Sequence, residues 1–253
     1  MAQNSPRIDA FLGGRLRLAQ PATGHRAGTD AALLAACVPP DAIGRAADVG
    51  AGVGAAGLAA LSRAPSLDMT CMEIEPALID LCRGNIDANG FGGRARAVEV
   101  DVLSARRRRE AGLADGRFDL VLTNPPFLAR GAVRVSPDPA RARAHVAVGG
   151  LEAWMKASLA LLAPGGLFFM IHRADALAGI LAGARGRIGD LRLLPVHAKT
   201  DGPAIRLLVA GRKGSRGPLA ILPSLTLHGS DGRFTPQAEA IHRGEAGIDL
   251  APH

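Results

Sequence analysis

The stretch Ala47-Asp48-Val49-Gly50-Ala51-Gly52-Val53-Gly54 decides the fold of this chain. Residues 45–50 are an apolar run that predicts a buried strand, and the alanine- and leucine-rich run to about Arg63 predicts a helix after the glycine turn. Glycines let the backbone approach a ligand closely, and the helix presents its free N–H groups. Asp48 adds negative charge, which favours a ligand with a cationic amino-acid end over a pyrophosphate. A glycine pattern alone is a weak signal.

An acidic residue closes the next predicted strand, 68–74. Glu73 follows Gly50 at about the 20-residue spacing of the acid that binds ribose hydroxyls in dinucleotide-type sites. Glu75 competes for this role, but it already lies in the turn before Pro76, so Glu73 is favoured.

The third predicted strand, 95–100, is also followed by an acid, Asp101. Its carboxylate suits an adenine amino group. Aspartate is equally favoured as the N-cap of the next helix. The two roles are compatible, and both stay open.

A fourth predicted strand, 118–123, leads into Asn124-Pro125-Pro126-Phe127. The prolines cannot continue the strand, since they lack an N–H and fix φ, and proline keeps the residue before it extended. Asn124 is therefore expected at the carboxyl end of the strand, where ligands bind in open α/β sheets. Its amide oxygen, the Pro125 carbonyl and the Phe127 ring suit a planar group that carries an NH2. A plain turn is the alternative, because Asn-Pro is a turn dipeptide.

Composition and charge bound the class of protein. The chain has 253 residues, 48% of them hydrophobic, which is enough for one large α/β domain. The formal charge of +7 and the pI near 10.5 favour a polyanionic partner. Arginine far outnumbers lysine, so a GC-rich genome is a second explanation of the charge. Three cysteines without metal-ligand spacing predict reduced thiols of a cytoplasmic protein with no metal.

Segments outside the central pattern add further expectations. Residues 1–23 are expected to form an extended basic arm, and 24–253 a single domain. Thr29 or Asp30 is expected to cap a helix that lies over the ligand. The runs 191–196 and 205–210 predict a terminal hairpin, and 219–227 predicts one more strand. No apolar run approaches the roughly 20 residues that a membrane span needs.

Two arginine-rich segments are candidates for contact with nucleic acid. The run 106–109 consists of four arginines, which usually marks a solvated helix face. The long loop 128–150 leaves the Asn124 motif and is the better candidate, because long loops in compact domains are often functional. Its candidate contacts are Arg130, Arg134, Arg141 and Arg143.

The order of these features resembles class I methyltransferases that act on exocyclic or amide nitrogens. Within them, the segment 27–34 (Ala-Gly-Thr-Asp-Ala-Ala-Leu-Leu) and the closing segment 225–238 resemble the bacterial tRNA (adenine-N6)-methyltransferases that modify the anticodon loop. The likeness spans roughly residues 20–243. It implies an α/β, Rossmann-like, seven-stranded, mostly parallel sheet with an antiparallel terminal hairpin and helices on both faces. It also implies tRNA as a partner and leaves the oligomeric state open between monomer and homodimer.

The resemblance implies a role for each matching residue. The catalytic set is Asn124, Pro125, Pro126 and Phe127. The residues implied to bind S-adenosylmethionine are Thr29, Asp30, Asp48, Gly50, Ala51, Gly52, Glu73, Ile74, Asp101, Val102 and Asn124. The activity implied is methylation of an adenine N6 in tRNA. A protein-glutamine methyltransferase is the main alternative, since a glutamine amide has the same planar NH2. A cofactor-binding protein without catalysis is less favoured, and so is an O-methyltransferase, which gains nothing from paired acceptors.

Overall fold

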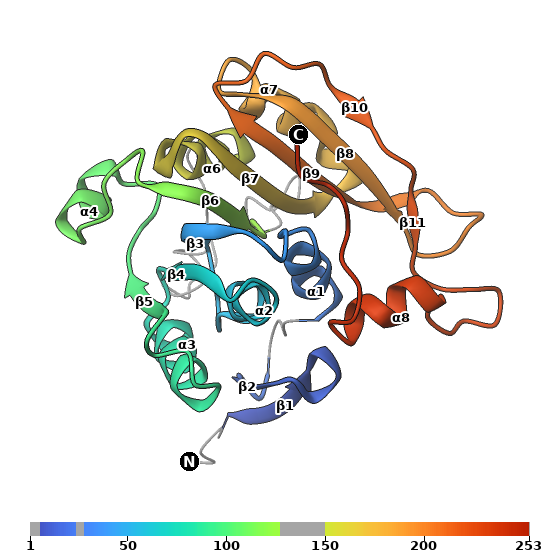
Figure 1. Cartoon of the computed structure of the whole chain (residues 1–253), viewed down its shortest axis with the longest axis horizontal. Coiled ribbons are helices and arrows are strands. Elements are labelled where there is room, and N and C mark those ends of the chain that lie inside the picture. The colour runs from blue at the N-terminus through green and yellow to red at the C-terminus, as the bar shows by residue number, and fades with distance from the viewer. Residues whose placement is uncertain (1–5, 24–27, 127–149, 253) are drawn as a thin grey trace, which may run out of the picture.

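The structure is a computed structural model, and it describes residues 6–23, 28–126 and 150–252 (Figure 1). Phe127 and the arginines predicted to contact nucleic acid between 128 and 149 lie outside the described residues.

A single large sheet organises the described residues. Its strand order is β10-β8-β9-β7-β6-β3-β4-β5, and β11 also pairs with β8 (Figure 1). Strand β9 is antiparallel to both of its neighbours, and the remaining pairs are parallel. The strands are β3 (Ile43–Val49), β4 (Ser66–Glu73), β5 (Ala95–Glu99), β6 (Phe118–Thr123), β7 (Leu162–Arg173), β8 (Ile188–His197), β9 (Ala204–Lys213), β10 (Ala220–Ile221) and β11 (Leu225–Thr226).

Helices cover both faces of this sheet. The helices are α1 (Thr29–Ala36), α2 (Ala55–Arg63), α3 (Pro76–Ala88), α4 (Ala105–Glu110), α6 (Gly150–Leu161), α7 (Leu177–Ala184) and α8 (Pro236–His242), with short 3₁₀ turns η1 (Leu12–Gly14) and η2 (Ala174–Ala176). Side chains from α1, α2, α3 and α8 share one apolar cluster with the sheet. Side chains from α6 and α7 share a second cluster on the other face. The class I methyltransferase architecture expected from the sequence is therefore confirmed. In the described ranges, no helix is long and apolar enough to cross a bilayer.

The edge of the sheet differs from the seven strands that were expected. The hairpin of β8 and β9 is confirmed, but the predicted strand 219–227 is two short strands. Pro223 lies between them, and a proline cannot donate a ladder hydrogen bond. The sheet of the described residues therefore counts nine strands, the seven expected and two short edge segments.

The N-terminal segment is a hairpin, so the expectation of an extended arm was wrong for its described part. Strands β1 (Arg7–Phe11) and β2 (Leu16–Gln20) pair antiparallel, and Leu16 and Leu18 are buried in the first cluster. Helix α3 binds the edge of β2: Asn85 Oδ1 accepts from the Ala19 N–H at 2.7 Å, and Asn89 Oδ1 accepts from the Arg17 N–H at 2.9 Å. Two side-chain amides of α3 thus accept hydrogen bonds from backbone N–H groups on the edge of β2 that faces this helix.

Helix starts were predicted with mixed success. Thr235 caps α8 as its Oγ1 accepts from the Ala238 N–H. The N-cap of α1 is Gly28, with no side-chain bond, so the expectation for Thr29 or Asp30 was wrong. The N-cap of α4 is Ser104, so Asp101 does not cap that helix. A capping residue must stand one position before the first helical residue, and sequence patterns place that position only to within a few residues.

Candidate active site

The carboxyl ends of three parallel strands meet at the candidate site. In the sheet register, Val49 of β3 pairs with Met72 of β4 and with Thr123 of β6. Neighbouring strands lie about 4.8 Å apart, so the residues that follow these positions are neighbours. The glycine turn, the end of β4 with Glu73, and Asn124 are therefore brought together, as the sequence predicts.

The glycine turn is built from backbone that only glycine adopts readily. Gly50 and Gly52 have φ of 74° and 55°. The N–H groups of Gly50 and Ala51 both donate to the Met72 carbonyl at 2.9 Å, which binds the turn to the end of β4. A Cβ added at Gly52 would meet no heavy atom within 4 Å, so this glycine borders open space. A ligand can approach the backbone at Gly52.

Glu73 links the end of β4 to the glycine turn. Its Oε2 accepts from the Gly52 N–H at 2.9 Å, and its Oε1 accepts from the N–H groups of Ile74 and Glu75 at 2.8 and 3.0 Å. A carboxylate has about four acceptor positions, and these bonds occupy three. Glu73 is therefore held rigidly with acceptor capacity left for a hydroxyl, which fits the ribose role. Glu75, the competitor, instead precedes α3 as its N-cap.

Asp48 lies beneath the turn. Its side chain is only 1% exposed, and Oδ2 accepts from the Gly57 N–H in the first turn of α2 at 2.8 Å. Burial raises the pKa of Asp48 to about 7, the Gly57 hydrogen bond opposes the shift, and the nearby Glu73 adds to it. The structure thus shows Asp48 joining strand to helix. Direct contact with the amino group of a cofactor stays a prediction.

Asp101 and Ile74 line one cavity of about 380 Å³ beside the ends of β4 and β5. Asp101 Oδ1 accepts from the Leu103 N–H at 3.0 Å in a tight turn, and Ile74 is 41% exposed. An apolar surface beside a carboxylate suits a flat ring with an amino group. Val102, also predicted here, is buried against the second cluster, so it supports the turn from below.

Asn124 provides an acceptor that the described residues leave free. Its Oδ1 is buried and has no hydrogen-bond partner among the residues that the structure describes. Such an atom costs roughly 1–3 kcal/mol when nothing satisfies it. Pro125 and Pro126 line an adjoining cavity of about 400 Å³ together with His172 and Arg173. A polar acceptor beside a cavity of this size is suited to binding a ligand that donates.

Trp154 and Thr123 belong to this region, and sequence reasoning missed their roles. The Trp154 Nε1–H donates to Thr123 Oγ1 at 2.9 Å, and that hydroxyl donates to the Val49 carbonyl at 2.7 Å. A Cβ on Gly50 would lie 2.8 Å from Trp154 Cζ2, so the indole packs directly under the turn. These contacts tie α6 to the ends of β6 and β3. The amphipathic pattern of residues 151–163 is typical of a helix that contains Trp154, but it carries no signal for this hydrogen bond.

Thr29 and Asp30 are held by the protein itself. Thr29 Oγ1 lies 3.0 Å from His242 Nε2 of α8. Both Asp30 oxygens accept from Arg206 Nε, at 3.1 and 3.0 Å, and the pair is partly buried. Arg206 pairs with Arg173 at the carboxyl end of β7, so α1 does begin at the site edge of the sheet. A direct bond from either residue to the cofactor stays a prediction.

The remaining buried polar and sulfur-containing residues near the sheet have structural environments. His172 is 6% exposed, and burial lowers its pKa, which suits a structural role. Cys37, Cys71 and Cys82 are free, buried thiols, as predicted. Within the ranges that the structure covers, no group of three or more potential ligands could hold a metal ion.

The fold and the site together define a class I methyltransferase with S-adenosylmethionine as its cofactor: a glycine turn with open space at Gly52, a fixed Glu73, and Asp101 beside an apolar surface lie along one edge. The chain belongs to the methyltransferase small domain family, whose model matches residues 25–176.

Comparison with curated proteins agrees with this class. A tRNA1(Val) (adenine(37)-N6)-methyltransferase of Porphyromonas gingivalis is 29% identical over 239 residues, covering 90% of this chain and 91% of its own. A release factor glutamine methyltransferase of Chlorobaculum tepidum is 29% identical over 161 residues, covering 61% and 54%. The first likeness runs the length of both chains, and the second is partial.

Solved structures agree on the fold. The crystal structure of a predicted O-methyltransferase from Agrobacterium tumefaciens has a TM-score of 0.74 at 32% identity, covering 88% of this chain and 98% of its own. The structure of P. horikoshii TYW2 in complex with MeSAdo has a TM-score of 0.56 at 13% identity, covering 85% and 74%, and shows the fold alone.

Proposed function

We propose that this protein transfers the methyl group of S-adenosylmethionine to the exocyclic N6 of an adenine in tRNA. The observation that carries the proposal is the buried Oδ1 of Asn124, which has no hydrogen-bond partner among the described residues. Asn124 follows Thr123, which pairs in register with Val49, the residue just before the glycine turn. The proposed donor site uses Glu73 for ribose hydroxyls, Asp101 for an adenine amino group, and the Gly50–Gly52 backbone for the methionine end.

The chemistry explains why an acceptor is needed. The lone pair of an adenine amine is delocalised into the ring, so the amine is a weak nucleophile. When bound, S-adenosylmethionine supplies an electrophilic methyl group on a sulfonium. Asn124 Oδ1 and the Pro125 carbonyl would accept the two N6 hydrogens, which increases electron density on nitrogen and orients its lone pair. Positioning and fixed dipoles then account for most of the rate, and the released proton passes to water. Phe127 is proposed to stack on a base turned out of its loop.

Several observations support tRNA over other substrates. The relatives that match this chain over nine-tenths of both lengths are named as tRNA (adenine-N6)-methyltransferases. The glutamine methyltransferase relatives match only part of the chain. The net charge of +7 suits a polyanion. The O-methyltransferase named among the solved structures fits Asn124 less well, since a hydroxyl has one hydrogen to offer two acceptors.

The test is a transfer assay with labelled S-adenosylmethionine. Unmodified tRNA transcripts, ribosomal RNA fragments and a release factor would be offered side by side to the full chain, and the labelled product digested to identify the methylated atom. We expect label on adenine N6 in tRNA. Label on a glutamine amide, with none on RNA, would replace the proposed function by the glutamine alternative.

A further inference from the structure

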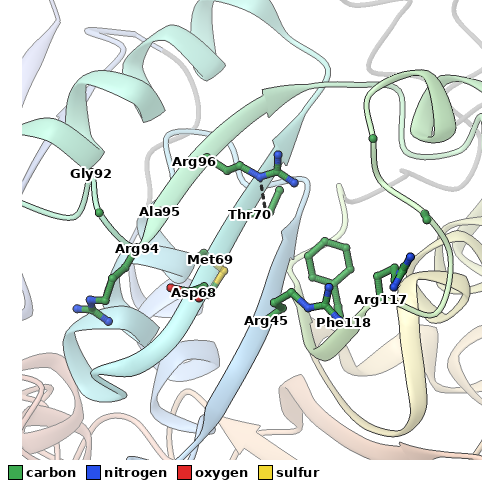
Figure 2. Close-up of a pocket in the computed structure, with 13 residues that line it drawn as sticks. Arg45, Asp68, Met69, Thr70, Gly92, Arg94, Ala95, Arg96, Arg117 and Phe118 are labelled. Carbon is green, nitrogen blue, oxygen red and sulfur yellow. Dashed lines mark hydrogen bonds between the residues drawn. The ribbon is translucent and has the colours of Figure 1, made fainter.

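A basic groove lies at the opposite end of the sheet from the candidate active site. It has a volume of about 660 Å³, and its lining includes Arg45, Arg96, Arg117, Asp68, Thr70 and Phe118 (Figure 2). Arg45 belongs to β3, Arg96 to β5, and Arg117 directly precedes β6. The groove therefore lies across the amino halves of the strands whose carboxyl ends form the active site. At about 3.3 Å per residue, Arg45 is roughly 16 Å along β3 from the glycine turn.

The groove breaks the core pattern of its own strands. Arg45 lies two and four residues before Ala47 and Val49, which are fully buried in the second cluster, so strand alternation places all three on one face. Thr70 of β4 likewise shares the face of buried Met72, and it pairs in register with Arg96. A genome rich in arginine codons explains arginines on solvated surfaces. It does not explain polar residues at positions that face the core in the other half of each strand.

The arginines of the groove have donors to spare. In the part of the chain that the structure describes, the side chains of Arg45 and Arg117 make no hydrogen bond and no ion pair. Arg45 pairs in register with Asp68, yet no ion pair joins them there. Arg96 uses one donor, since its Nε–H bonds Thr70 Oγ1 at 3.2 Å (Figure 2). Guanidinium groups with free, forked donors are the side chains best suited to phosphate oxygens.

A basic segment joins the groove to the active-site edge. The chain leaves β5 at Asp101, forms α4, and returns to the amino edge at Arg117. Arg107 of α4 lines the same cavity as Asp101, whereas Gly112 and Arg117 line the groove. Arg108 is buried in an ion pair with Asp115, which fixes α4 between the two. Residues 105–117 hold five arginines against Glu110 and Asp115, a net charge of +3, but Arg106, Arg107 and Arg108 are ion-paired with those two acids. The segment therefore adds a modest positive charge between the two edges, and the guanidinium groups with free donors that carry the argument are those of the groove.

We propose that this groove binds the phosphodiester backbone of the RNA substrate, at phosphates remote from the base that is methylated. The inference rests on the proposed function for the nature of the substrate. Arg45, Arg96 and Arg117 each donate to phosphate oxygens. The contact adds affinity and orientation without reading the sequence, because phosphates carry none.

The test compares two double variants that each remove two positive charges. Arg45→Gln/Arg117→Gln removes the two unpartnered groove arginines. Arg185→Gln/Arg216→Gln removes two exposed arginines elsewhere and is the matched control. Binding of a labelled, unmodified tRNA transcript would be measured over a range of salt concentrations, with circular dichroism to check folding and calorimetry to measure affinity for S-adenosylmethionine.

We expect the groove variant to bind tRNA about 10-fold more weakly, with the slope of log K against log salt reduced by about 2, and to bind S-adenosylmethionine as the wild type does. The control variant should bind tRNA more tightly than the groove variant does, and its salt slope should stay closer to that of the wild type. Equal losses in the two variants would mean a general charge effect and would overturn the groove. An unchanged slope of log K against log salt in the groove variant would also overturn the proposed RNA contact.

The outcome is separable from that of the proposed function. The identity of the methylated atom decides the function, and the salt slope decides the groove. If the wild-type protein methylates tRNA and the groove variant binds tRNA with an unchanged salt slope, the proposed RNA contact at the groove is wrong and the proposed function stands. If the wild-type protein methylates only a protein substrate, both the proposed function and the proposed RNA contact are wrong.

Discussion

The two ends of strands β3 and β4 satisfy their polar groups in different ways. At the carboxyl end, Glu73 accepts three backbone N–H groups and Asp48 accepts one, so each carboxylate is fixed by main chain. At the amino end, Arg45 and Asp68 face each other in register, and no ion pair joins them in the described residues. Hydrogen bonds to the backbone fix the carboxylates at the carboxyl edge, whereas the charged side chains at the amino edge are not paired with each other. The difference is what the two proposals require: fixed acceptors at the edge proposed for catalysis, and cations with free donors at the edge proposed to attract RNA.

The largest effect is expected at Asn124. We expect Asn124→Ala to lower kcat by about 10²–10³-fold, because it removes the fixed acceptor for the substrate amine. Affinity for S-adenosylmethionine should be unchanged, as measured by calorimetry. Asn124→Asp is the matched control: it keeps an acceptor oxygen and should retain more activity than alanine in single-turnover methyl transfer. If Asn124→Ala transfers methyl groups at an undiminished rate, the proposed mechanism is wrong, and so is the assignment of catalysis to the carboxyl edge of the sheet.

A second test uses the buried Asp48. Burial raises its pKa to about 7 in the folded protein, above the ordinary value near 4, so the folded state holds this proton more tightly. Its contribution to the free energy of unfolding is therefore complete below about pH 4 and is lost as pH rises to about 7. Asp48→Asn keeps an acceptor for the Gly57 N–H and should remove about 4 kcal/mol of this pH dependence, since each pKa unit is worth about 1.4 kcal/mol. Urea unfolding at several pH values measures the free energy of unfolding of both proteins. If that free energy changes with pH in the same way in both, the prediction is contradicted.

The smallest expected effect is a difference in stability between alanine variants at Gly50 and Gly52, two glycines of the same turn. Gly50→Ala meets both a positive φ and the Trp154 ring at 2.8 Å, whereas Gly52→Ala meets a positive φ alone. We expect Gly50→Ala to lower the free energy of unfolding by about 2 kcal/mol more than Gly52→Ala. Gly52→Ala should instead weaken cofactor binding, because its Cβ enters the open space of the site. Equal stabilities in urea unfolding would show that the turn is looser than the structure indicates.

Much of the fold was predictable from the chain. The strand at Phe118–Thr123 begins and ends where the apolar run predicted, because prolines stop it. The start of α3 was predictable for a related reason, since Pro76 fits the first turn of a helix. Local signals of this kind act within a few residues. They also placed Glu73 and Asn124 at strand ends, which in a parallel sheet share one edge.

The remainder depended on contacts between distant segments. The bond from Trp154 to Thr123 joins residues 31 positions apart, and the ion pair of Asp30 with Arg206 joins residues 176 apart. The pairing of the N-terminal hairpin with Asn85 and Asn89 is of the same kind. No periodicity encodes such partners. The role of Asp101 as a cap failed for a local reason, because Ser104 stands nearer the helix start.

The position of Trp154 has a practical consequence. It is the sole tryptophan of the chain, and the chain has no tyrosine, so nearly all of its ultraviolet fluorescence comes from one ring. That ring packs under Gly50, where the proposed donor meets the backbone. The protein therefore carries an intrinsic fluorophore at the floor of the proposed cofactor site, and we expect its emission to change when S-adenosylmethionine binds, without any attached dye.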